Sequence, residues 1–210
     1  MPEVVPQIEP HTTNVYGVHL LKTRHRFIRK LRSLAEPSSH GDKIWPANFL
    51  LMDFLSEYPP KSRTRLMDLG CGWGLVGIHC ALKYGCKVTC VDKDAAVFPF
   101  VTVHATLNQV KVGLLKQTYD RLTRARLGEE RTVVGADICY WPELVKPLCN
   151  LVERALRSGV ERIVIADPGR KPFYDFSDLC GEKYGAVSRG WYAREPGRVY
   201  GDVLEIIRKS

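Results

Sequence analysis

Residues 65–74, which read RLMDLGCGWG, give the first indication of the fold class of this chain. The apolar run before Gly70 is typical of a short buried strand, and residues 75–84 are typical of a helix that ends at Gly85. Glycines between a strand and a helix permit a tight turn and let a ligand approach the backbone closely. The segment therefore predicts a strand, a ligand-binding loop and a helix in succession.

Strands and helices alternate along the rest of the chain. Further strands are expected at residues 86–92, 110–115, 131–137, 162–167, 185–188 and 203–207, and further helices at residues 46–57, 95–108 and 142–158. This alternation predicts a doubly wound α/β fold with a mostly parallel sheet, in which ligands bind at the carboxyl ends of the strands. We expect residues 1–41 to form an accessory basic helical arm, ahead of a cofactor-binding domain at residues 42–210.

The glycine loop has the spacing G-x-G-x-G at Gly70, Gly72 and Gly74, which differs from a dinucleotide-binding loop, and the chain has no P-loop sequence. Asp68 would repel a pyrophosphate, but it suits a ligand with an ammonium and a sulfonium group, as in S-adenosylmethionine. Asp92 ends the next strand, where a carboxylate accepts hydrogen bonds from both ribose hydroxyls. The alternative is that Asp92 caps the helix that follows it. We predict an S-adenosylmethionine site at these residues.

Asp137 and Tyr140 follow the strand at residues 131–137, so they are expected beside the methyl group of a cofactor bound at the glycine loop. Methyl transfer is an in-line displacement, for which the enzyme mainly supplies proximity and orientation. The Asp137 carboxylate would orient an acceptor amine, and Tyr140 with Trp141 would form an aromatic wall around the alkyl stem. The alternatives are that Asp137 caps the next helix and that Tyr140 is a core residue.

These motifs together resemble the seven-strand, class I S-adenosylmethionine-dependent methyltransferases over roughly residues 42–208. Four segments are similar to methyltransferase family 16 and to the electron transfer flavoprotein β-subunit lysine methyltransferases, namely KIWPA at 43–47, TLN at 106–108, DICY at 137–140 and ADPGR at 166–170. The resemblance implies a seven-stranded Rossmann-like sheet and N-methylation of lysine in a protein substrate.

Three further site residues are predicted beside this resemblance. Trp45 has a cofactor-side role in the family, and the alternative is a merely buried ring. Arg170 would pair with an acidic patch of the substrate or bond loop carbonyls. Asp120, after the strand at 110–115, is a candidate for binding the adenine amino group.

The chain has 31 Lys and Arg against 23 Asp and Glu, a net charge of +8. Residues 22–32, KTRHRFIRKLR, contribute much of the excess. They form either a solvated helix face or a docking surface for an acidic protein or RNA.

The seven cysteines show no C-x-x-C or zinc-finger spacing, so no metal site is expected. No apolar run approaches the ~20 residues of a membrane span, and the first residues do not resemble a secretory signal. We therefore expect a cytoplasmic protein.

Three other functions remain open. An RNA-base methyltransferase would suit the basic arm, although Ile138 and Cys139 replace the prolines of the N/D-P-P-Y/F motif. A small-molecule N- or O-methyltransferase commonly has a larger lid than this chain has room for. A non-catalytic binding scaffold would bind the cofactor weakly or not at all.

Overall fold

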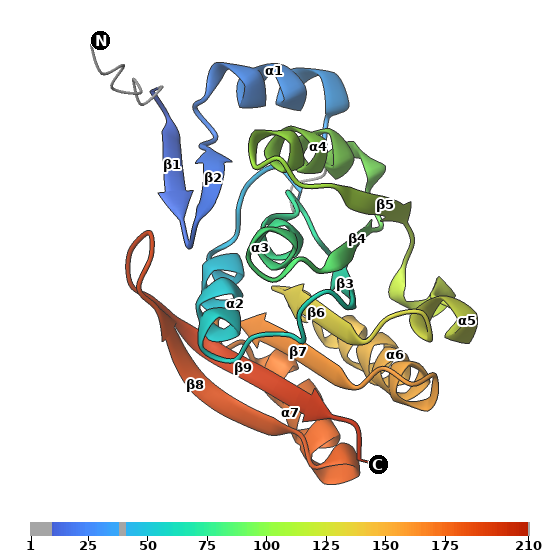
Figure 1. The fold of residues 1–210 in the computed structure, drawn as a ribbon. Coiled ribbons are helices and arrows are strands. Elements are labelled where there is room, and N and C mark those ends of the chain that lie inside the picture. The colour runs from blue at the N-terminus through green and yellow to red at the C-terminus, as the bar shows by residue number, and fades with distance from the viewer. Residues whose placement is uncertain (1–9, 38–40, 210) are drawn as a thin grey trace.

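The computed structural model describes residues 10–37 and 41–209, in which a seven-stranded sheet lies between two layers of helices (Figure 1). The strand order is β5-β4-β3-β6-β7-β9-β8. The strands span β3 Arg65–Leu69, β4 Lys87–Asp92, β5 Val112–Lys116, β6 Thr132–Ala136, β7 Arg162–Asp167, β8 Val187–Ala193 and β9 Val199–Ile207. The first five strands are parallel, and β9 runs antiparallel to β7 and β8. The predicted doubly wound, mostly parallel sheet is confirmed.

Helices cover both faces of this sheet. They span α2 Pro46–Glu57, α3 Leu75–Tyr84, α4 Phe98–Leu107, α5 Arg124–Leu127, α6 Val145–Arg157 and α7 Lys171–Tyr184, with short 3-10 turns η1 Ala95–Val97, η2 Tyr119–Arg121 and η3 Pro142–Leu144. From β3 the chain winds through β4 and β5 to one edge, and it then returns to β6 and β7 on the other side of β3. Strand order therefore reverses between β3 and β6, which is where such folds bind ligands.

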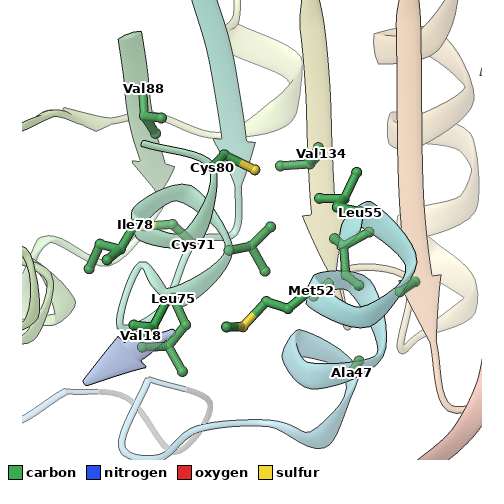
Figure 2. Close-up of a cluster of buried hydrophobic side chains, with 14 of the residues drawn as sticks. Val18, Ala47, Met52, Leu55, Cys71, Leu75, Ile78, Cys80, Val88 and Val134 are labelled. Carbon is green, nitrogen blue, oxygen red and sulfur yellow. The ribbon is translucent and has the colours of Figure 1, made fainter. Parts of the chain in front are cut away.

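The two faces of the sheet have separate apolar cores. Side chains alternate between faces along each strand, so Leu66 and Val134 pack with α2 and α3, whereas Met67 and Val133 pack with α6 and α7. Figure 2 shows part of the first core, where side chains from α2 and α3 meet. These cores fix the carboxyl ends of β3, β4 and β6 relative to one another.

The N-terminal segment contains more than the predicted helix. A hairpin of β1 (Thr12–Val15) and β2 (Val18–Leu21) precedes α1 (Arg26–Ala35). The helix begins later than the basic run because His25 caps it, its ring nitrogen accepting a hydrogen bond from the Phe27 N–H. Residues 1–9 and 38–40 of the predicted arm lie outside the described residues.

Residues of this segment pack into the main domain. Ile28 of α1 is fully buried with Trp73 and Phe100, and Val18 of the hairpin belongs to the core around α2 and α3. Asn108, at the end of α4, accepts a hydrogen bond from the His19 N–H (2.8 Å) and donates one to the His19 carbonyl (2.9 Å). The hairpin and α1 are therefore attached to the same helices that support the glycine loop.

The C-terminal part also differs from the expectation. Helix α7 was not predicted, although Pro172 in its first turn and Gly185 at its end are ordinary helix-end signals. The strands β8 and β9 are longer than predicted because they pair with each other along their length. Within residues 10–37 and 41–209, no helix combines the length and the apolar composition that crossing a membrane requires.

Candidate active site

A cavity of about 540 Å³ lies at the carboxyl ends of β3, β4 and β6, beside the point where strand order reverses. Nine of the predicted site residues line it, namely Trp45, Gly70, Gly72, Asp92, Asp120, Asp137, Tyr140, Trp141 and Arg170. Asp68 and Gly74 are not among the lining residues. The fold thus brings together side chains that are up to 125 residues apart in the sequence.

All three loop glycines have positive φ angles, but the space available for a side chain differs among them. A Cβ on Gly70 would lie 2.7 Å from Ile138, and one on Gly74 would lie 2.8 Å from Val101. A Cβ on Gly72 would meet no atom within 4 Å, and Gly72 lines the cavity. Gly72 therefore gives a ligand access to the backbone. Gly74 instead caps α3 and allows Val101 of α4 to pack closely, and its predicted contact with the cofactor stays a prediction.

Asp68 lies beneath the glycine loop rather than at the cavity. Its carboxylate is buried and accepts a hydrogen bond from the Gly77 N–H at 2.9 Å. Burial raises the pKa of Asp68 to about 7, against the lowering effect of that hydrogen bond. In the structure this side chain ties β3 to the first turns of α3, and its predicted pairing with a cationic ligand stays a prediction.

Asp92 ends β4 with its carboxylate at the cavity. One carboxylate oxygen accepts from the Gly72 N–H (3.1 Å) and the other from the Asp94 N–H (3.0 Å). Burial raises the pKa of Asp92, while these two hydrogen bonds lower it. Asp94 caps the following turn by accepting from the Ala96 N–H. The helix-capping alternative therefore applies to Asp94, and Asp92 fixes the glycine loop.

The opposite end of the cavity is formed by residues after β6 and β7. Asp137 follows β6 with a left-handed φ of 61°, and its carboxylate accepts a hydrogen bond from the Arg170 guanidinium. Arg170 also bonds the buried Asp167 carboxylate at 2.9 Å. It was expected to face a substrate patch or loop carbonyls, and in the structure its side-chain partners are two carboxylates of its own chain. Trp141 rather than Asp137 occupies the cap position before η3.

Aromatic side chains surround this end of the cavity. Tyr140 is half-buried, with the Arg170 guanidinium 5.9 Å from its ring centre and the Lys93 ammonium 3.4 Å from its hydroxyl. Trp141 packs edge-on against Tyr140 and is 57% exposed. The core alternative for Tyr140 does not hold, because its side chain lines the cavity. Both rings line the cavity, so an apolar chain that ends in a polar group could lie alongside them.

The cavity wall on the side of α2 is tied to the glycine loop. Trp45 lines the cavity, with the Lys43 ammonium 4.2 Å from its ring centre. Trp73, in the middle of the glycine loop, donates its indole N–H to the Gly41 carbonyl at 2.9 Å and stacks on Phe100. Residues 41–45 are therefore held against the loop by a side chain that the sequence analysis did not single out.

Tyr119 and Lys93 are among the lining residues that were not predicted. Tyr119 follows β5 next to Asp120, and burial together with the nearby Asp92 charge raises the pKa of its phenol. Lys93 directly follows Asp92. Their positions after the carboxyl ends of β5 and β4 are the signal that identifies them. Asp120 itself is exposed at the cavity rim, and its pKa is lowered mainly by the hydrogen bond from the Thr118 hydroxyl.

Comparisons with known proteins agree with this geometry. A family model described as "Lysine methyltransferase" matches residues 30–172. The electron transfer flavoprotein beta subunit lysine methyltransferase of Xenopus laevis is 31% identical over 168 residues, covering 72% of this chain and 68% of that protein. The histidine protein methyltransferase 1 homolog of Bos taurus is 31% identical over 113 residues, covering 50% of this chain and 30% of that protein.

More distant relatives share the fold. A ubiquinone biosynthesis O-methyltransferase of Rickettsia bellii is 26% identical over 127 residues, 60% of this chain and 52% of that protein, so this chain spans about half of its length. The structure of a SAM-dependent methyltransferase from Agrobacterium tumefaciens aligns with a TM-score of 0.62 and 14% identity, over 79% of this chain and 63% of that one. TrmN from Thermus thermophilus aligns with a TM-score of 0.58 and 16% identity, over 92% of this chain and 56% of that one.

The cavity residues fit S-adenosylmethionine. The volume of the cavity lies within the roughly 300–1,000 Å³ of small-molecule sites. The open side of Gly72 leaves room for a ligand against the loop backbone, and the Asp92 carboxylate offers acceptors to a diol. Carboxylates at Asp92 and Asp120 suit a cationic ligand. With the family match over more than half of its length, the chain belongs to the lysine methyltransferase family of class I, S-adenosylmethionine-dependent methyltransferases.

Proposed function

We propose that this chain N-methylates a lysine side chain of a protein, with S-adenosylmethionine as the methyl donor. The observation that supports this proposal is the acceptor end of the cavity, where the Asp137 carboxylate lies beside the aromatic side chains of Tyr140 and Trp141. Two similar proteins are named as enzymes that methylate proteins, one on lysine and one on histidine. An aromatic wall with one carboxylate suits a long alkyl stem that ends in an amine.

The cofactor would occupy the end of the cavity formed by the glycine loop, β4 and the turn after β5. We assign the ribose hydroxyls to Asp92, the loop contact to Gly72 and the adenine side to Asp120 with Tyr119. Trp45 would close the cavity from the start of α2. When bound, S-adenosylmethionine supplies a methyl group on a sulfonium, whose sulfur keeps the electron pair of the broken bond.

The acceptor end must orient a neutral amine toward that methyl group. A lysine has a reference pKa near 10.4, so deprotonation at pH 7 costs roughly 4.6 kcal/mol. A cation near the amine lowers this cost by disfavouring the ammonium form, and Lys93 lines the cavity. The Asp137 carboxylate can accept a hydrogen bond from the amine N–H and so aim its lone pair. Tyr140 and Trp141 would exclude water from the alkyl stem.

A labelling experiment tests the acceptor class. The purified chain is incubated with methyl-tritiated S-adenosylmethionine and a cell lysate, with and without nuclease, and labelled protein is hydrolysed to separate methylated amino acids. We expect nuclease-resistant label that elutes with methyl-lysines. Label in methyl-histidine, in nuclease-sensitive material or only in small molecules would contradict the proposal. The Asp137→Asn variant serves as the matched control, because it keeps the side-chain size and should bind the cofactor.

Interaction with RNA through residues 22–32, an acidic docking surface on the substrate and a cytoplasmic location stay predictions. In the structure, Arg32 at the end of α1 is paired with Asp42 at 3.0 Å, next to the cavity-lining residues Gly41 and Lys43. The basic helix is thus connected to the cavity wall by an ion pair. This connection supports a role for α1 near the substrate and does not select between the two partner classes.

A further inference from the structure

We propose that Arg170 is a positioning residue, which holds the Asp137 carboxylate and the Tyr140 ring in place for the methyl acceptor and does not bind the substrate itself. The proposal rests on the proposed function only for the identity of the acceptor. It replaces the expectation that Arg170 pairs with an acidic patch of the substrate.

The Arg170 side chain bridges the ends of two neighbouring strands. Its guanidinium donates to Asp137, after β6, and to Asp167, the last residue of β7. Asp167 is fully buried and also accepts from the backbone N–H groups of Gly169 (3.0 Å) and Arg170 (2.9 Å). A planar guanidinium that bridges two fixed groups has little freedom to move. Asp167 therefore anchors Arg170, and Arg170 in turn anchors Asp137.

The same guanidinium is close to the second predicted catalytic residue. Its central carbon lies 5.9 Å from the centre of the Tyr140 ring, within the range of a cation–π interaction. The backbone of Asp137 is fixed as well, because its N–H donates to the Ala166 carbonyl of β7 at 2.9 Å. What Arg170 adds is the direction of the Asp137 side chain and the position of the ring.

Charge argues against a direct contact between Arg170 and an acidic substrate. One guanidinium is shared by the two carboxyl groups of Asp137 and Asp167, so the cluster has no surplus positive charge to offer. Only 33% of the Arg170 side chain is exposed. Without the guanidinium, these two carboxyl groups would face each other, and the side chain of Asp137 would turn away because Asp167 is the more buried of the two.

A double-mutant cycle on methyl transfer separates the two roles. The variants are Arg170→Gln, Asp137→Asn, both together, and Arg170→Lys, with Lys171→Gln as control, since Lys171 is exposed and pairs only with Asp175 among the described residues. We expect Arg170→Gln to lower kcat by about 100-fold through misplacement of the carboxylate, with KM changed by less than threefold. The double variant should lose much less than the product of the two single losses, because both substitutions act largely through one carboxylate.

Three readouts complete the test. Calorimetry with S-adenosylhomocysteine should give a Kd within twofold of the wild type for every variant. The kcat of Arg170→Lys should be at least threefold higher than that of Arg170→Gln. A KM increase at constant kcat in Arg170→Gln, or losses that multiply in the double variant, would overturn the proposal. Crystal structures of the wild type and of Arg170→Gln, each with S-adenosylhomocysteine, test the proposal without a methyl acceptor. If the Asp137 carboxylate has the same position in both structures, the proposal is refuted. If the label enters RNA instead of protein, the proposed function fails, and the same cycle on that acceptor still tests Arg170.

Discussion

At one end of the cavity, the glycine loop and Asp92 are held together by hydrogen bonds between backbone N–H groups and one carboxylate. At the other end, the side chains of Asp137, Tyr140 and Arg170 position one another through an ion pair and a ring contact. The first arrangement joins residues 20 apart and depends on backbone conformation. The second joins residues 33 apart, and each side chain depends on the others. We therefore expect changes at the first end to affect cofactor binding and changes at the second to affect transfer.

The largest expected effect is on cofactor affinity. Asp92→Ala removes the acceptor for the ribose hydroxyls and also the acceptor of two backbone hydrogen bonds, one from Gly72 in the loop and one from Asp94. Two charge-assisted hydrogen bonds lost at about 2 kcal/mol each correspond to about a 1,000-fold weaker Kd for S-adenosylhomocysteine. Titration calorimetry measures this change. An affinity within threefold of the wild type would remove Asp92 from the cofactor site.

Asp137→Ala tests whether the two ends are independent. It should slow methyl transfer by about 100-fold, because the acceptor loses the group that orients it. The Kd for S-adenosylhomocysteine should stay within twofold of the wild type, since among the described residues the Asp137 carboxylate pairs with Arg170 and not with the glycine loop. Rates come from single-turnover transfer to the labelled acceptor. Equal losses in binding and rate would contradict the division into two ends.

Gly72→Ala probes the open side of the loop with a single methyl group. The substitution adds about 1–2 kcal/mol of backbone strain at its left-handed φ of 51°. Because the new Cβ would project where we place the cofactor, we expect roughly tenfold weaker binding. Gly17→Ala is the matched control, since Gly17 also has positive φ and open space but lies in the β1–β2 turn. It should lose similar stability in urea unfolding without a change in Kd.

Trp73→Phe has the smallest expected effect. It keeps the stacking on Phe100 and removes the indole hydrogen bond to the Gly41 carbonyl. The free energy of unfolding should fall by about 0.5–1.5 kcal/mol, as for a typical buried hydrogen bond. Urea denaturation measures it, and calorimetry should show a small loss of cofactor affinity because residues 41–45 line the cavity. Unchanged stability would show that this hydrogen bond does not hold the cavity wall.

The sequence pointed to residues that line both ends of the cavity, because glycine spacing and the ends of strands can be recognised over a few neighbouring residues. It did not predict the partner of Asp68, because the hydrogen bond from the Gly77 N–H depends on how α3 packs. The partners of Arg170 were also not predictable, since Asp137 approaches it only after β6 and β7 pair.

By itself, the sequence determined the alternation of strands and helices and the glycine loop, because apolar periodicity and glycine content act over a few neighbouring residues. The tertiary structure decided which groups meet, including the packing of β1, β2 and α1 on the helices beside the loop. It also decided that Arg170 is bound by two carboxylates of its own chain. Contacts of this kind depend on strand order and side-chain packing, which bring distant residues together at one edge of the sheet.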